Sequence, residues 1–117
     1  MEVKRGEVYF ATLGDSACNI GSEQEGYRPV LIVQNDIGNK YSPTVIVCCM
    51  TSKIYKTQIP THVRLNAFDY GLTEDSLILC EQIKTIDKMR LRNKLTELNK
   101  NDLQRVNTAI KLSLNIV

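Results

Sequence analysis

Five short strand-like segments follow one another closely in this sequence, and no long helical pattern separates them. They are the ranges 7–13, 29–35, 44–51, 60–65 and 76–83. The second and third are near-continuous apolar runs, whereas the first alternates, with Val8 and Phe10 on one face and Tyr9 on the other. The connections 35–43 and 69–75 are rich in turn residues. This pattern predicts a mainly β fold, an antiparallel barrel or sandwich.

One helix is expected, at the end of the chain. Asn99 or Asn101 can cap it, and Asp102 in the first turn suits the positive end of the helix dipole. Apolar residues then recur at helical spacing: Leu103, Val106, Ile110 and Leu114. The stripe predicts that the helix packs on the barrel as a lid. A short helical turn is also expected within 85–94.

Length and net charge limit the number of domains and the classes of protein to which the chain can belong. Its 117 residues suit one domain, 1–117, and its net charge of +2 excludes a polybasic protein that binds nucleic acid by charge alone. No apolar run could cross a membrane, so we expect no membrane partner. No signal segment follows the N-terminus, and none of the four cysteines forms a CxxC pair. We therefore expect a cytoplasmic protein with reduced cysteines, in which the neighbours Cys48 and Cys49 face opposite ways.

Several kinds of catalytic site are missing from the sequence. His62 is the only histidine, so a nuclease or protease built on a histidine pair is excluded within one chain. The carboxylates are scattered, and Glu74–Asp75 is the only adjacent pair, which makes a two-metal nuclease a poor fit. No Walker loop, GxGxxG or HExxH motif occurs. No metal and no other cofactor is expected.

Arg28 and Pro29 lead from a polar loop into the second apolar run, and Thr51 and Ser52 end the third. If these two strands are antiparallel neighbours, Arg28 lies near Thr51. A guanidinium fork and a hydroxyl together suit a phosphate.

Other side chains near this pair extend the pattern. Lys53 and Lys56 add positive charge, and Tyr27 and Tyr55 offer rings on which bases can stack. The other interpretation is a solvated hairpin end with ordinary surface charges, and composition alone favours it.

Several segments together resemble the MazF (PemK-type) toxins of bacterial toxin–antitoxin systems. They are RGEVYFATL, GSEQEGYRPVLIVQND, PTVIVCCMTS, IPTHV and LILCEQIKTIDKMRL. The resemblance runs from about Lys4 to the end of the C-terminal helix. It implies a small SH3-like, PemK-type β-barrel of about five to seven strands with a C-terminal helix, working as a homodimer.

The resemblance also implies an activity. Members of this family are toxins that cut single-stranded mRNA at specific sequences without a metal, leaving 2′,3′-cyclic phosphate and 5′-OH ends and so inhibiting translation. A cognate MazE-like antitoxin neutralises them. The family's catalytic pair maps onto Arg28 and Thr51. The residues expected to bind RNA are Ser22, Glu23, Gln24, Tyr27, Pro29, Ser52, Lys53, Lys56 and Gln82.

The sequence departs from the usual pattern of the family at two places. The loop 14–24 is longer than usual for the family, and Cys48, Cys49 and Met50 stand where small or aliphatic residues are common. A CcdB-like barrel toxin that acts on a protein target such as gyrase is one alternative. A non-catalytic RNA-binding barrel is the other. The sequence leaves open the recognised RNA word, the antitoxin and the general base, for which Glu23 is a candidate.

Overall fold

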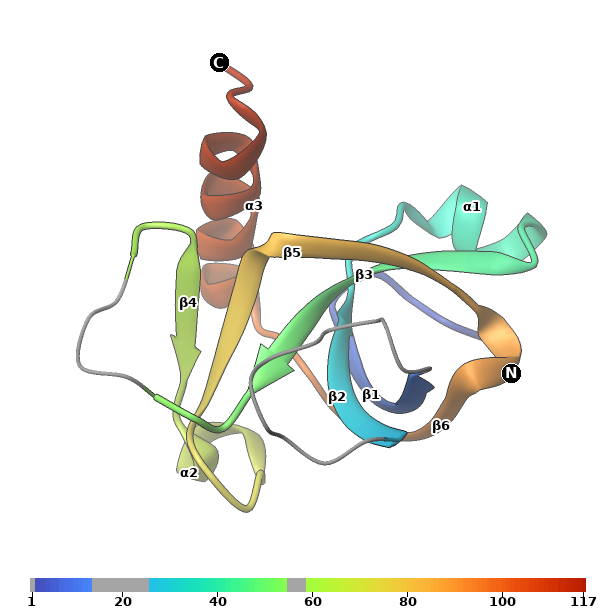
Figure 1. The fold of residues 1–117 in the computed structure, drawn as a ribbon, viewed down its shortest axis with the longest axis horizontal. Coiled ribbons are helices and arrows are strands. Elements are labelled where there is room, and N and C mark those ends of the chain that lie inside the picture. The colour runs from blue at the N-terminus through green and yellow to red at the C-terminus, as the bar shows by residue number, and fades with distance from the viewer. Residues whose placement is uncertain (1, 14–25, 55–58) are drawn as a thin grey trace.

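The computed structural model describes residues 2–13, 26–54 and 59–117. In these ranges the strands form one six-stranded antiparallel sheet in the order β4-β5-β3-β2-β1-β6 (Figure 1). The strands are β1 (Glu7–Leu13), β2 (Gly26–Ile32), β3 (Thr44–Thr51), β4 (His62–Leu65), β5 (Ser76–Asp87) and β6 (Leu91–Glu97). The helices are α1 (Asp36–Tyr41), α2 (Ala67–Tyr70) and α3 (Lys100–Leu114), with a 3₁₀ turn η1 (Lys88–Arg90). The expected mainly β fold with a C-terminal helix is confirmed.

The long strand β5 gives the sheet its curvature. Its 12 residues pair with β4 at one end and with β3 along most of their length. The β3–β5 register shifts between Cys48 and Cys49, and such a bulge bends a strand and increases its twist. Figure 1 shows β5 arching over β3, β2 and β1.

The two faces of the sheet bury separate apolar clusters. Val8 and Cys48 belong to a cluster completed by Val106 and Ala109 of α3, which we call the α3-side core. The opposite face has its own cluster, the opposite-face core, with these members: Val3, Tyr9, Ala11, Leu13, Val30, Ile32, Val45, Val47, Cys49, Ile86 and Leu91. The expected alternation along 7–13 and the opposite orientations of Cys48 and Cys49 are thus confirmed.

Strand β2 begins and ends three residues earlier than expected. The connection 35–43 is not a plain turn, because Asn35 caps α1 by accepting a hydrogen bond from the Gly38 N–H at 2.8 Å. The chain must leave the sheet before that cap, so β2 ends at Ile32. Arg28 consequently lies inside the strand and not at its entrance.

The C-terminal helix begins as expected and packs differently at its end. Asn99 is the cap and accepts from the Asp102 N–H at 2.8 Å. Val106 is buried, but Leu114 is 53% exposed, so the predicted stripe is wrong at its last position. Ala109, which the pattern did not include, is buried instead. The expected helical turn in 85–94 is η1, and β6, which follows it, was not expected.

The three cysteines among the described residues differ in their bonding state. Cys48 and Cys80 are free and buried, but Cys49 is disulfide-bonded, so the expectation that all four are reduced is wrong. No helix in the described ranges is both long enough and apolar enough to cross a membrane.

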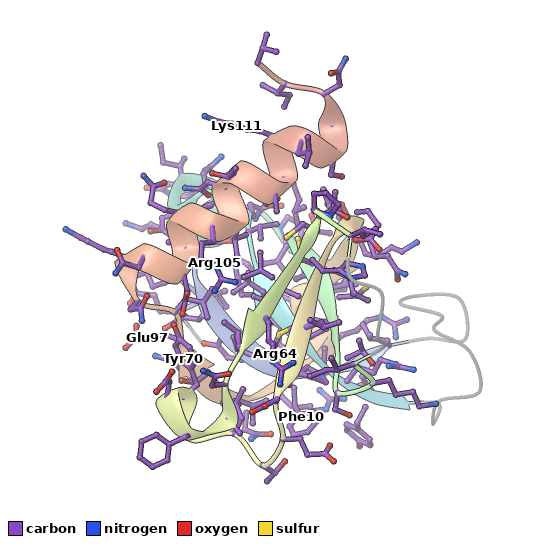
Figure 2. All side chains as sticks on the ribbon, turned by 90° about the vertical axis from the view of Figure 1, so that its left-hand side faces the viewer. Phe10, Arg64, Tyr70, Glu97, Arg105 and Lys111 are labelled. Carbon is purple, nitrogen blue, oxygen red and sulfur yellow. The ribbon has the colours of Figure 1, made fainter. Side chains whose placement is uncertain are left out.

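The Tyr70 hydroxyl donates a hydrogen bond to the Asp102 carboxylate and so ties α2 to the first turn of α3. Figure 2 labels Tyr70, which lies below the start of α3 in that view. Burial raises the pKa of Asp102, but the Tyr70 hydroxyl and the Arg105 guanidinium outweigh it and hold that pKa below its usual 3.8. Burial and the bond to Asp102 raise the pKa of Tyr70 to about 12. The ionised form of Asp102 therefore stabilises the fold.

Replacing Tyr70 with Phe is expected to lower the free energy of unfolding by about 1–2 kcal/mol at neutral pH. A carboxyl whose pKa is depressed by folding stabilises above its unfolded value and loses that effect as pH falls through its folded value. The difference in the free energy of unfolding between the parent and Tyr70→Phe should therefore become smaller at pH values below 3.8, the usual pKa of this carboxyl. Urea unfolding at pH 7 and at about pH 3 measures both differences.

Tyr41→Phe is the matched control, because Tyr41 is 75% exposed. It should leave stability unchanged at both pH values. An equal loss for Tyr70→Phe at pH 7 and pH 3 would show that the ionised carboxylate of Asp102 is not what the hydroxyl stabilises.

Candidate functional site

One end of the sheet holds an open pocket of about 530 Å³. The start of β2, the end of β3 and α2 all lie at this end, at the bottom of Figure 1. The described residues that line it are Phe10, Tyr27, Arg28, Pro29, Met50, Thr51, Ser52, Lys53, Gly71, Leu72, Thr73, Glu74, Ser76 and Leu95. The volume lies within the roughly 300–1,000 Å³ of typical ligand sites.

Strand register brings Arg28 and Thr51 together. Val30 of β2 lies opposite Cys49 of β3. Continued by two residues beyond the last paired residues, this register puts Arg28 opposite Thr51, and both residues line the pocket. The pairing predicted from the sequence therefore agrees with the observed register.

Pro29 separates this pair from the regular ladder. It has no N–H to donate, and the β2–β3 pairing stops at Val30 and Cys49. Pro29 is instead paired with Phe10 of β1. The ends of β2 and β3 therefore border the pocket, and both contribute residues to its lining.

Both side chains of the pair are largely removed from solvent. Arg28 is 8% exposed and Thr51 is 3% exposed. A guanidinium keeps its charge in any protein environment, and burial strengthens its attraction for an anion by lowering the local dielectric. The arrangement offers a fixed positive charge and a hydroxyl at the wall of an open pocket, which can bind a phosphate.

The turn after β3 fixes the Thr51 side chain. The Lys53 N–H donates to Thr51 Oγ1 at 3.1 Å. This bond holds the hydroxyl oxygen in one position next to the exposed side chains of Ser52 and Lys53. Less rotamer freedom is then left to lose when a ligand binds.

Only some of the residues expected to bind RNA line the pocket. Tyr27, Pro29, Ser52 and Lys53 line the pocket together with Arg28 and Thr51. Gln82 lies on β5 and is not among the described lining residues. The remaining expected residues, Ser22, Glu23, Gln24 and Lys56, lie outside the described residues, as does Tyr55.

The turn between α2 and β5 supplies a wall that the sequence did not assign to the site. Gly71 ends α2 in the left-handed conformation, with φ of 64°, and Leu72, Thr73 and Glu74 follow it into the pocket lining. The adjacent carboxylates Glu74 and Asp75 were the only sequence signal for this segment.

Asp75 holds that turn in place. Its carboxylate accepts from the Ala67 N–H at 2.7 Å and from Arg64 at 2.9 Å. The Ala67 N–H and then the Arg64 guanidinium lower the pKa of Asp75. The Ser76 hydroxyl donates to the Glu74 carbonyl at 3.2 Å. The backbone at Glu74 is therefore held by the hydrogen bonds of the two residues that follow it, Asp75 and Ser76.

His62 lies outside this pocket, on β4. Its Nε2 is 3.1 Å from the Glu81 carboxylate, and its Nδ1 is buried without a hydrogen-bond partner. Within residues 2–13, 26–54 and 59–117, no three His, Cys, Asp or Glu side chains are grouped so that they could hold a metal ion.

Residues 4–114 match the family of PemK-like, MazF-like toxins of type II toxin–antitoxin systems. The endoribonuclease EndoA of Bacillus subtilis (strain 168) is 51% identical over 117 residues, which are 100% of this chain and 98% of that protein. The endoribonuclease MazF of Staphylococcus saprophyticus is 53% identical over 114 residues, which are 97% of this chain and 92% of that protein.

A solved structure is similar over nearly the whole chain. It is an endoribonuclease in complex with its cognate antitoxin, from Mycobacterial species, with a TM-score of 0.76 and 25% sequence identity. The similarity covers 98% of this chain and 97% of that one.

Proposed function

This chain belongs to the family of PemK-like, MazF-like toxins of type II toxin–antitoxin systems, and we propose that it is an endoribonuclease toxin whose cleavage site is the Arg28–Thr51 pocket. The single observation that carries the site is the strand register. It sets a nearly buried guanidinium opposite a nearly buried hydroxyl at the wall of an open pocket. Such a pair can stabilise the negative charge that develops when a phosphodiester is cleaved.

The proposed reaction uses the RNA's own 2′-OH as nucleophile. Its oxygen attacks the neighbouring phosphorus and the bond to the 5′-oxygen breaks, which leaves a 2′,3′-cyclic phosphate and, after protonation, a 5′-OH. Negative charge increases on the non-bridging oxygens in the transition state, and Arg28 binds it through its planar fork. Thr51 hydrogen-bonds the same phosphate and aligns the attack.

Proton transfer needs a further group. A guanidinium remains protonated at neutral pH, so Arg28 is unsuited to accept the proton of the 2′-OH, and a threonine hydroxyl is no better. The pair is therefore assigned to charge stabilisation and alignment. Glu23, the candidate base from the sequence, lies outside the described residues.

The rest of the RNA is bound by side chains around the same pocket. Tyr27 is 63% exposed and can stack on a base, and the exposed Lys53 attracts the backbone. Pro29 and Ser52 border the phosphate position. The loop residues Ser22, Glu23 and Gln24, together with Lys56 and Gln82, are proposed to extend the contact.

The proposed partners follow the family. The substrate is single-stranded mRNA, the inhibitor is a MazE-like antitoxin, and the working form is a homodimer in the cytoplasm. The similar Mycobacterial endoribonuclease, solved with its cognate antitoxin, supports the antitoxin. The chain is proposed to be one domain over 1–117, and no metal is proposed to take part.

The purified protein is expected to cut a mixed-sequence single-stranded RNA in excess EDTA. Every cut should fall in one short motif, and the ends should be a cyclic phosphate and a 5′-OH, because the 2′-OH is the nucleophile. Sequencing of the fragments and mass spectrometry of their ends measure both features. The DNA of the same sequence is the control. An intact RNA, or cleavage that appears only when Mg²⁺ is restored, would contradict the proposal.

A further inference from the structure

The pocket that Arg28 and Thr51 line also has a partly apolar wall. Phe10, Leu72 and Leu95 give it an apolar lining, and they come from β1, the α2–β5 turn and β6. Figure 2 shows Phe10 at the same end of the sheet as α2. None of these three side chains has a polar group that could hydrogen-bond a phosphate.

A flat, partly apolar group fits this lining. Nucleobases stack on aromatic side chains, and specific readers of single-stranded RNA place unstacked bases in such sites. Phe10 and Leu95 line the same pocket as Arg28 and Thr51. A base bound there therefore belongs to a nucleotide that adjoins the cleaved phosphate.

Glu74 is the one carboxylate among the described residues that line the pocket. The side chain is exposed, and its backbone is held by the Asp75 and Ser76 hydrogen bonds. An ionised carboxylate only accepts hydrogen bonds. The Glu74 carboxylate therefore attracts the edge of a nucleobase that carries N–H donors. It repels a nucleobase that puts a carbonyl oxygen at the same position.

We propose that this wall is a nucleobase subsite in which Glu74 selects a base that carries an exocyclic amino group, next to the cleaved phosphate. Adenine, cytosine and guanine each present an amino donor, whereas uracil presents only carbonyl acceptors and one ring N–H. The inference rests on the proposed ribonuclease function and adds a specificity-determining residue to it.

Glu74→Gln tests the assignment, because an amide of the same shape both donates and accepts. RNAs randomised at the two nucleotides that flank the cut are cleaved by each protein, and the products are sequenced. The parent should disfavour uracil at one flanking position by about tenfold or more, which is the discrimination expected of a direct hydrogen-bond contact. The variant should reduce that preference to within about twofold, with other positions of the motif unchanged.

Glu97→Gln is the matched control. It removes the same charge from an exposed carboxylate on β6 that does not line the pocket, and its sequence preference should equal the parent's. An unchanged preference in Glu74→Gln, or a parent that accepts uracil equally at both positions, would overturn the subsite. A parent that does not cut RNA at all would instead overturn the proposed function.

Discussion

Replacing Arg28 with Lys is expected to lower the cleavage rate by about 10²–10³-fold, the usual cost of removing one preorganised donor from a transition-state anion site. The variant keeps a positive charge but loses the planar fork that binds two phosphate oxygens at once. Because Arg28 is only 8% exposed and lies opposite Thr51, a shorter point charge at that position cannot reproduce the geometry. RNA binding should change far less than the rate.

Single-turnover kinetics with saturating enzyme separate these two effects. The rate constant reports the transition state and the concentration dependence reports RNA affinity. Arg28→Ala should abolish measurable cleavage, and circular dichroism with thermal unfolding shows whether either variant remains folded.

Lys53→Ala is the matched comparison, because Lys53 is an exposed cation at the same pocket. It should weaken affinity and reduce its salt dependence, with the single-turnover rate nearly unchanged. A folded Arg28→Lys protein that cuts within threefold of the parent rate would show that the fork of Arg28 does not bind the transition state.

The proposed phosphate-binding pair could be predicted from the sequence because the proximity of Arg28 and Thr51 depends on strand register. Counting residues along two consecutive apolar strands puts Arg28 near Thr51 if the strands are antiparallel neighbours, and they are. An error of three residues in the position of β2 did not matter. An antiparallel register that pairs Val30 with Cys49 brings Arg28 near Thr51 wherever the ends of the two strands fall.

The wall formed by the α2–β5 turn could not be found in the same way. Phe10, Leu95 and the turn residues come from separate elements, and their proximity depends on how the sheet curls. Helix α2 has only four residues, too few for a periodic pattern. The adjacent carboxylates Glu74 and Asp75 stood out in the sequence, but nothing there says that Asp75 anchors the turn while Glu74 reaches the pocket.

Helix α1 lies where the sequence predicts a turn. Residues 35–43 contain Asn, Asp, Gly, Ser and Pro, which indicate a turn. Asn35 is also a strong helix cap, and the side chain of the buried Asn39 forms hydrogen bonds with Gln34. Tertiary hydrogen bonds thus decide between two local structures that the sequence permits.

A single deoxynucleotide at the cleaved position is expected to prevent cleavage completely. In the proposed reaction the attacking atom is the 2′-oxygen of the nucleotide on the 5′ side of the scissile phosphate. Removing that oxygen removes the nucleophile, while every phosphate and base that the pocket contacts remains. Affinity should therefore change little, since one hydroxyl contributes only a small part of a binding energy that comes mostly from the backbone.

The most direct measurement uses two short RNAs of the mapped motif in excess EDTA, identical except for this one 2′-deoxy substitution. Filter binding gives the affinity of each and denaturing gels give the cleavage. Equal binding, with the all-RNA strand cut and the substituted strand intact, is the result expected if Arg28 and Thr51 act on a phosphate attacked by its own 2′-OH. Cleavage of the substituted strand at the same bond would contradict it, because the nucleophile would then have to be water or a protein side chain.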